Sequence, residues 1–236
     1  MVKTAIILAG GLGTRLRDAV PNLPKAMAPI NNRPFLEYQL DYWIRQGINN
    51  FILSVGYLSD LIIGHFGKSY NGASIKYNVE SEPLGTGGGM FQAAIDLNEI
   101  FLVLNGDTFI EVDLKNLYKF HLQSKSNWTF ALFRTSESDR YLTMEISSNG
   151  QIFSSNNEQK ESSGLANGGA YLIDPVALNL LGISSGDSAS LEDQLIPNLV
   201  SNGGRVFGLE CKGKFIDIGI PEDYYRLSDI LPISIE

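Results

Sequence analysis

The chain has 236 residues, of which 44% are hydrophobic and 19% are charged, and its formal net charge is −8. This length is enough for one large domain with a buried core, so neither disulfides nor a structural metal is required. A single cysteine, Cys211, excludes an intramolecular disulfide framework and a CxxC zinc site, and the two histidines argue against a histidine-rich metal site. The acidic balance argues against a nucleic-acid partner but is compatible with an anionic small substrate.

The N-terminal sequence carries no pattern typical of a membrane span or an export signal. Its apolar stretch, residues 4–9, is much shorter than a membrane helix and runs directly into a glycine-rich segment that contains Arg15. A signal-peptide core would not continue in that way. We therefore expect a cytoplasmic protein without a membrane partner.

The first half of the sequence predicts strands that alternate with helices. Strands are expected at 5–8, 51–55, 75–79 and 100–104, and helices at 34–46, at 59–66 with Ser59 as the cap, and at 87–97. This alternation indicates an α/β protein with a mainly parallel sheet covered by helices on both faces. In such sheets, ligands bind at the carboxyl ends of the strands.

The second half is less regular. Strands are predicted at 128–134, 141–146 and 170–173, and the polar segment 147–163 is predicted to be a loop or a hairpin crossing. Ser190 and Asp193 have the spacing of a capping box, and Pro221 marks the start of a final helix. No repeat, linker or low-complexity segment divides the chain, so we expect a single domain.

The strongest motif is the glycine-rich segment 8–16, Leu-Ala-Gly-Gly-Leu-Gly-Thr-Arg-Leu, which follows the first predicted strand. Glycines let the backbone approach an anion, so successive N–H groups can surround phosphate oxygens. The spacing is neither a P-loop nor GxGxxG, because Leu16 stands where the third glycine belongs. A phosphate-binding loop or a tight turn remains, and Arg15 favours phosphate. Lys25, which Pro24 would hold in the same loop, is a second candidate cation.

Two aspartates near strand ends are candidate metal ligands. Asp107 follows the strand 100–104 in the tripeptide Asn-Gly-Asp, which is also typical of a turn. Asp217 lies in the apolar run 215–219, where a carboxylate is costly unless it is paired, hydrogen-bonded or metal-bound. Together the two aspartates could bind Mg²⁺, which takes one or two carboxylates plus phosphate oxygens.

A third motif, residues 80–88, follows the predicted strand 75–79 and contains two acids, a proline and several glycines. The carboxylate of Glu80 or Glu82 could accept hydrogen bonds from the N1–H and N2–H₂ groups of guanine. A surface loop with solvated acids explains the same residues equally well.

Taken together and in this order, the motifs resemble those of the sugar-1-phosphate nucleotidyltransferases. The resemblance runs from about residue 4 to residue 225 and includes segments 10–16, 24–25, 82–88, 105–107 and 216–224. It implies a Rossmann-like three-layer sandwich with a mixed, mainly parallel central sheet. It also implies one domain, 1–236, with a nucleotide-binding half at about 1–110 and a sugar-phosphate-binding half at about 111–236.

The resemblance implies a role for individual residues. The nucleotide would be bound by Leu8, Ala9, Gly10, Gly11, Gly13, Thr14, Glu80, Pro83, Gly85 and Thr86. The sugar would be bound by Asn105, Gly106, Asn167 and Gly168. The catalytic residues would be Arg15, Lys25, Asp107 and Asp217, of which the two aspartates would hold Mg²⁺.

The implied reaction joins a nucleoside triphosphate to a sugar 1-phosphate and releases pyrophosphate. Segments 27–31, 33–37, 139–141 and 167–169 favour GTP and a heptose 1-phosphate as substrates. The alternatives are GTP with mannose 1-phosphate, or UTP or dTTP with another sugar phosphate. Assembly into a homo-oligomer is left open.

Two positions depart from the family pattern. Leu142 stands where many relatives have glycine, and Asn-Asn-Glu at 156–158 stands where many have Glu-Glu-Lys. A catalytically silent sensor of nucleotide sugars is therefore a further hypothesis. Glu192 resembles a recurring position of the family, although a role in the helix cap explains it as well.

Overall fold

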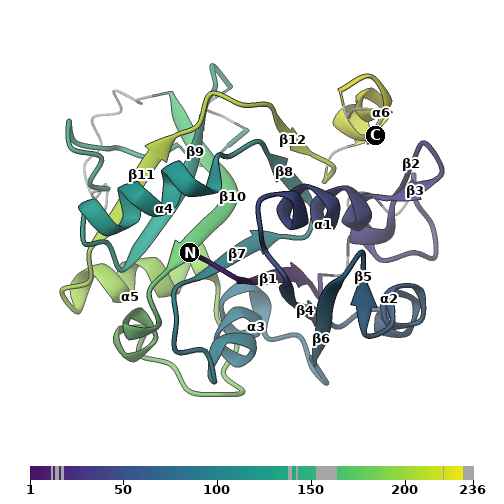
Figure 1. Cartoon of the computed structure of the whole chain (residues 1–236), viewed down its shortest axis with the longest axis horizontal. Coiled ribbons are helices and arrows are strands. Elements are labelled where there is room, and N and C mark those ends of the chain that lie inside the picture. Colours follow the sequence, from purple (N-terminus) through teal and green to yellow (C-terminus); the bar gives the residue numbers. More distant parts are fainter. Residues whose placement is uncertain are drawn as a thin grey trace.

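The structure, a computed structural model, describes residues 1–11, 13, 16, 19–137, 140–141, 143–152, 164–219 and 221–230, with 228–230 described by their backbone only. An eight-stranded sheet forms the centre of the molecule, in the order β11-β9-β10-β7-β1-β4-β6-β5 (Figure 1). Its strands are β1 (Thr4–Ala9), β4 (Asn50–Val55), β5 (Ser69–Tyr70), β6 (Ala73–Val79), β7 (Phe101–Asn105), β9 (Trp128–Arg134), β10 (Leu165–Ile173) and β11 (Val206–Glu210). Pairing is parallel except for β10 and the short edge strand β5, so the sheet is mixed and mainly parallel, as predicted.

Helices cover both faces of this sheet and complete the predicted Rossmann-like three-layer sandwich. One face packs against α1 (Phe35–Arg45), α2 (Ser59–Phe66) and α4 (Leu114–Gln123). The opposite face packs against α3 (Gly85–Ala94), a 3₁₀ helix η3 (Pro175–Leu180), a π-helix η4 (Leu191–Leu195) and α5 (Ile196–Ser201). None of the helices in the described part of the chain is long and apolar enough to span a bilayer.

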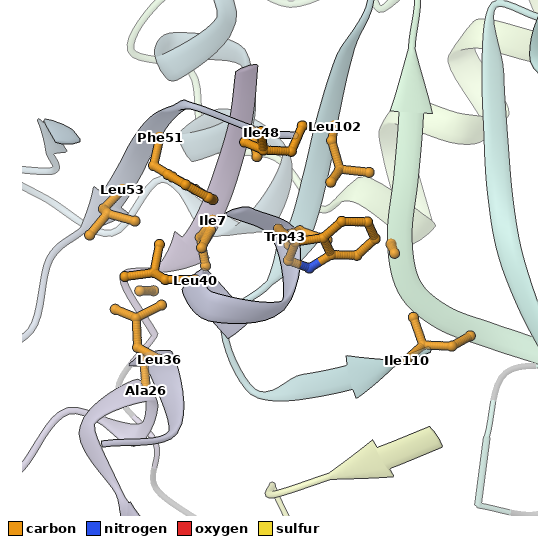
Figure 2. Packing of buried hydrophobic residues seen from close by; sticks show 14 of the residues in the cluster. Ile7, Ala26, Leu36, Leu40, Trp43, Ile48, Phe51, Leu53, Leu102 and Ile110 are labelled. Atoms are coloured by element: carbon orange, nitrogen blue, oxygen red, sulfur yellow. The ribbon is translucent and has the colours of Figure 1, made fainter. Parts of the chain in front are cut away.

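The central strand β1 shows why the sequence begins with an apolar run. Successive side chains of a strand point to opposite faces, so Ile7 packs in one hydrophobic cluster and Ile6 in the other. Both side chains are fully buried. In Figure 2, Ile7 lies between Leu40 of α1 and Phe51 of the neighbouring strand β4. A strand covered on both faces needs apolar residues at every position rather than alternating ones.

Two small sheets lie beside the central one, and one of them, formed by β8 and β12, connects the end of the chain to its first half. Strands β8 (Thr108–Ile110) and β12 (Phe215–Asp217) pair antiparallel, and so do β2 (Pro29–Ile30) and β3 (Arg33–Pro34), which follow the 3₁₀ helix η2 (Lys25–Met27). The last helix, α6 (Pro221–Ile230), begins at Pro221 as predicted. Leu227 of this helix packs with Ile218 and Phe35 in a third cluster, so the apolar run around Asp217 serves this core.

The structure contradicts two local predictions. The described residues of the segment 141–146, which leave out residue 142, form no strand: Thr143 and Ile146 make only isolated bridges, to Ala166 and Ile152. β7 already pairs with β10 from Ala170 to Ile173, so only the first part of β10 is open on that side. Ser59 does not cap α2. It is the first helical residue, and the cap position is Leu58, in the left-handed conformation with φ 52°.

Other local predictions are confirmed. Ser190 caps η4, where its Oγ accepts a hydrogen bond from the backbone N–H of Asp193 at 3.1 Å. Within the polar segment 147–163, the part up to residue 152 forms a turn that returns to pair Ile152 with Ile146, as in a hairpin. Residues 153–163 lie outside the described part of the chain.

Candidate active site

A cavity of about 350 Å³ lies at the carboxyl ends of β1, β6 and β7. Every predicted nucleotide-binding residue that the structure describes lines it, from Leu8 to Gly13 and from Glu80 to Thr86. Lys25, Ala26, Asn105, Gly106 and Asp107 complete its lining. Thr14 and Arg15 lie outside the described residues. The strands of a parallel sheet end at one edge, which is why segments so far apart in the sequence meet here.

Two glycines show opposite requirements at this edge. A Cβ atom on Gly106 would lie 2.4 Å from the carbonyl oxygen of Leu8, so the close approach of β7 to β1 requires glycine. A Cβ atom on Gly11 would have no protein atom within 4 Å, so packing in the described structure does not require glycine there. Gly11 lines the cavity, and the open space beside it leaves the backbone accessible to a ligand.

Glu80 presents a carboxylate of fixed orientation to the cavity. Its Oε1 accepts a hydrogen bond from Ser54 Oγ at 2.9 Å, and its Oε2 accepts one from the backbone N–H of Leu84 at 3.1 Å. Asn78 Nδ2 in turn donates to Ser54 Oγ at 3.0 Å. Of the two predicted candidates for base recognition, Glu80 lines the cavity, whereas Glu82 is exposed outside it.

Sequence reasoning did not identify Ser54 and Asn78, which hold Glu80. A usable signal was present, because Ser54 is a polar residue inside an apolar strand and is fully buried. Buried polar side chains are normally hydrogen-bonded, so such a residue indicates a partner worth orienting. That the partner is Glu80 follows only from the pairing of β4 with β6.

Three of the predicted catalytic residues lie together. Lys25 Nζ donates a hydrogen bond to Asp107 Oδ2 at 2.6 Å. β12 pairs with β8 so that Asp217 is opposite Thr108, the residue after Asp107, and the N–H of Ile218 donates to the Asp107 carbonyl at 2.9 Å. A Cβ atom on Gly219 would meet both Lys25 Nζ, at 2.3 Å, and Asp217 Oδ1, at 2.6 Å.

Asp217 lies on the wall of a second cavity, of about 550 Å³, at the ends of β9, β11 and β12. Two of the arginines that line this cavity, Arg134 and Arg140, are paired with acids of the same lining. Arg134 Nε lies 2.8 Å from Glu210 Oε1, and Arg140 pairs with Asp223. Asp107 lines only the first cavity, so the two aspartates lie where the two cavities adjoin.

The predicted sugar-binding residues divide into two pairs. Asn105 and Gly106 line the first cavity, whereas Asn167 and Gly168 lie in β10 at an irregularity of its pairing with β9 and are not part of the lining. A Cβ atom on Gly168 would lie 2.8 Å from the carbonyl oxygen of Ala131, so close packing requires this glycine. Asn167 donates from Nδ2 to the hydroxyl of Tyr171 at 2.8 Å.

The fold and the cavity together define a nucleotide-binding protein with acidic and basic side chains at the carboxyl edge of its sheet. Residues 4–232 match the nucleotidyl transferase family, and the chain belongs to this family of enzymes.

Similar proteins have more specific names. The chain is 39% identical over 226 residues to the D-glycero-alpha-D-manno-heptose 1-phosphate guanylyltransferase of Aneurinibacillus thermoaerophilus, covering 94% of this chain and 95% of the relative. It is 38% identical over 222 residues to the Campylobacter jejuni protein of the same name, covering 94% and 97%. The crystal structure of HddC from Yersinia pseudotuberculosis superposes with a TM-score of 0.83 at 31% identity, covering 97% and 99%. HddC has also been crystallised in complex with GMP-PN.

Proposed function

We propose that this protein is a guanylyltransferase that joins GTP to D-glycero-D-manno-heptose 1-phosphate and produces GDP-heptose and pyrophosphate. The observation that carries the proposal is the identity of 38–39% with two enzymes of that name over nearly the full length of both chains. The lining of the first cavity supports it, because the described glycine-loop residues and Glu80 surround the same space. GTP and sugar phosphates are metabolites of the cytoplasm, where we place the reaction.

In this proposal, the guanine base is recognised by Glu80. Its two oxygens are held by Ser54 and by the N–H of Leu84, and each oxygen retains a lone pair for the N1–H or N2–H₂ group of guanine. The backbone from Leu8 to Gly13, with Thr14, would surround the phosphates, and Pro83, Gly85 and Thr86 would contact the base and ribose. These roles make residues 1–110 the nucleotide-binding half.

The proposed reaction is a single in-line displacement. A phosphate oxygen of the sugar 1-phosphate attacks the α-phosphorus of GTP, a new P–O bond forms, and the bond from the α-phosphorus to the bridging oxygen breaks as pyrophosphate leaves. The chemistry requires positioning and charge stabilisation more than covalent participation by the protein. Lys25 would reduce the repulsion between the attacking and α-phosphates, and Arg15 would stabilise the charge that develops on pyrophosphate.

Asp107 and Asp217 would bind Mg²⁺. The described residues contain no group of three or more candidate metal-ligating side chains, and Mg²⁺ needs no such group when it is also bound by phosphates and water. The register of β8 and β12 supports a shared ion, since it brings the two aspartates to one edge. When bound, the ion would polarise the phosphate and stabilise developing negative charge.

The acceptor sugar would lie on the β10 side of the first cavity, next to Asn105 and Gly106. Asn167 and Gly168 belong to β10, the strand paired with β7 in the sheet. Residues 111–236 would accordingly form the sugar-phosphate-binding half of a single domain.

The proposal is tested by measuring pyrophosphate release with GTP, ATP, UTP and dTTP, each combined with heptose 1-phosphate, mannose 1-phosphate or glucose 1-phosphate, in the presence of Mg²⁺. The expected result is the highest kcat/KM for GTP with heptose 1-phosphate and a product with the mass of GDP-heptose. A preference for another pair would correct the substrate. Binding of GTP without turnover of any sugar phosphate would instead favour the sensor hypothesis and contradict the enzyme.

A further inference from the structure

A buried glutamine, Gln39 of α1, holds both ends of the turn that carries Asp107. Its Nε2 donates hydrogen bonds to the carbonyl of Asn105 at 2.8 Å and to the carbonyl of Thr108 at 2.5 Å. These two residues flank Gly106 and Asp107, and Gln39 itself is only 1% exposed. An amide NH₂ group has two hydrogens, so the two bonds use its full donor capacity. One side chain of α1 therefore joins the end of β7 to the start of β8.

The contacts of Gln39 fix the orientation of its amide at a cost to stability. Both neighbours of Nε2 are carbonyl oxygens, which only accept hydrogen bonds, so the NH₂ end must face them. The Oε1 atom is buried and has no hydrogen-bond partner among the described residues. An apolar side chain of the same size would avoid the cost of this unpaired acceptor. The polar group is thus explained by the two carbonyls that it holds and not by the packing of α1.

The turn that Gln39 holds also links the two aspartates of the proposed metal pair. The carbonyl of Asp107 accepts a hydrogen bond from the N–H of Ile218 at 2.9 Å, and Thr108 is opposite Asp217 in the pairing of β8 with β12. Because Gln39 bonds the carbonyl of Thr108, it acts on the backbone between the two carboxylates. Loss of its hydrogen bonds would let Asp107 move relative to Asp217.

A second glutamine makes bonds of the same kind outside the candidate active site. Gln46, the C-cap residue of α1, donates from Nε2 to the carbonyl of Val112 at 2.7 Å, and its Oε1 accepts from the N–H of Leu114 at 2.8 Å. It lies about two helical turns beyond Gln39, on the same face of the helix. Val112 and Leu114 are not part of the lining of either cavity described above. Gln46 therefore separates the attachment of α1 from the positioning of the turn.

We propose that Gln39 is a positioning residue for the reaction: it fixes the Asp107 carboxylate through the backbone on both sides of it, and so sets the affinity for the ion that Asp107 and Asp217 would share. Gln39 touches neither the substrates nor the ion in this arrangement. Mg²⁺ requires nearly ideal placement of its ligands, so small displacements of one carboxylate weaken its binding. This inference rests on the proposed function and adds to it a residue outside the lining of the cavity.

The experiment compares Gln39→Met with the matched control Gln46→Met. Methionine keeps an unbranched side chain of similar size and has no hydrogen-bond donor. Mn²⁺ replaces Mg²⁺ in a titration followed by electron paramagnetic resonance, with protein in excess over GTP and without a sugar phosphate, so that no turnover is needed. The Mg²⁺ midpoint and the kcat of pyrophosphate release are measured in parallel. Gln39→Asn, whose amide is one methylene shorter, is the milder variant, and it carries the test if Gln39→Met does not fold.

Both methionine variants should lower the ratio of folded to unfolded protein by about 5- to 30-fold, because each removes hydrogen bonds to the backbone. Only Gln39→Met should also weaken Mn²⁺ binding and raise the Mg²⁺ midpoint, by about 10- to 100-fold, the usual cost of removing a group that orients a metal ligand. The KM for GTP at saturating Mg²⁺ should change by less than about threefold. Gln39→Asn should give a smaller shift in the same direction.

A double variant tests whether Gln39 acts through Asp107. Asp107→Asn should itself weaken Mn²⁺ binding, and the addition of Gln39→Met should then cause less than about a threefold further loss. Residues that act through one another are not additive, whereas two independent defects would be.

The inference is overturned if Gln39→Met binds Mn²⁺ within about threefold of the unaltered protein, or if Gln46→Met weakens Mn²⁺ binding as much, as loosening of α1 would. If Gln39→Met does not fold, an unchanged affinity in Gln39→Asn overturns it. Failure of the proposed function gives a different result. Bound Mn²⁺ without pyrophosphate release from any sugar phosphate would contradict the enzyme, yet the Mn²⁺ titration would still test Gln39. Absence of Mn²⁺ binding by the unaltered protein with GTP would overturn the shared metal site and this inference together.

Discussion

Lys25 Nζ and Asp107 Oδ2 lie 2.6 Å apart although 82 positions separate the two residues in the chain. They meet because η2, which begins at Lys25, follows β1 while Asp107 follows β7, and these two strands are neighbours in the sheet. The Lys25 side chain is 13% exposed and that of Asp107 is 35% exposed, so the pair forms a wall of the cavity that a phosphate can still reach.

Replacement of Lys25 by methionine removes this cation and keeps most of the side-chain volume. We expect kcat/KM for pyrophosphate release to fall by about 100-fold or more, because a positioned charge that stabilises a transition state contributes that much. The unfolding midpoint should change little, since Asp107 retains access to water. Lys119→Met, on the exposed face of α4, is the control and should keep full activity. Activity within threefold of normal in Lys25→Met would refute the role.

Removal of one carboxylate of the proposed metal pair should weaken the binding of Mg²⁺, and not only that of the nucleotide. We expect Asp217→Asn to raise the Mg²⁺ concentration for half-maximal rate by about tenfold or more, which corresponds to ~1.4 kcal/mol. Asp107→Asn should act in the same direction. Titration of pyrophosphate release with Mg²⁺ at saturating substrates measures the shift. Asp96→Asn, at an exposed position after α3, should leave the titration unchanged. An unchanged midpoint in both aspartate variants would exclude the shared site.

The base preference should depend on Glu80 and not on its neighbour Glu82. Glu80→Gln replaces a charged acceptor with a neutral amide that can also donate, so we expect the ratio of kcat/KM for GTP to that for ATP to fall by about 10- to 100-fold. Glu82→Gln makes the same change at an exposed position and should leave the ratio unaltered. An equal effect of both variants would show that Glu80 acts through overall charge rather than by contact with the base.

The buried His121 should make stability depend on pH. Burial lowers the pKa of His121 to about 4, although the charge of Asp174 partly opposes this. The unfolded chain, with a histidine pKa near 6.5, binds a proton below that pH that the folded protein does not. The contribution of His121 to the free energy of unfolding is therefore complete above pH 6.5 and decreases as the pH falls toward 4.

The comparison of the unaltered protein with His121→Gln isolates this effect, because the carboxylates are common to both. Between pH 7.5 and pH 4.5, the unaltered protein should lose on the order of 2 kcal/mol more of its free energy of unfolding than the variant. Urea denaturation at the two pH values measures this difference. His121 Nδ1 lies 2.8 Å from Thr129 Oγ1, a contact that glutamine can retain in part. Equal losses in both proteins would show that His121 is protonated in the folded state.

The local sequence pattern was sufficient to predict elements in which buried residues recur with a regular period. The strand at 128–134 has the predicted bounds, and the helix predicted at 34–46 lies at 35–45, because strand and helix periodicities are visible within one segment. The same reasoning was wrong for the described residues of 141–146, where alternation of side chains was present but only a short stretch of β10 was open beside β7. Whether an edge is free depends on the other strands of the sheet and not on the segment itself.

The residues of the candidate site also fall into those that the sequence could identify and those that it could not. The glycine-rich turn after β1, the Glu80 loop and the Asn-Gly-Asp turn could be identified from the amino acids, because each follows an apolar strand directly and strands of a parallel sheet end at one edge. The hydrogen bonds of Ser54 to Glu80 and of Gln39 to the carbonyls of Asn105 and Thr108 could not, since each joins residues brought together by the pairing of strands or the packing of a helix.

The amino-acid sequence alone was enough to determine the order of the elements, the α/β class and the glycine-rich segment that is the candidate phosphate loop, because these follow from short-range periodicity and backbone freedom. Only the tertiary structure decided that Lys25 pairs with Asp107, that β12 brings Asp217 to the same edge, and that a buried glutamine holds both ends of the turn around Asp107. Such contacts depend on strand register and side-chain direction across long separations, which local free energies do not encode.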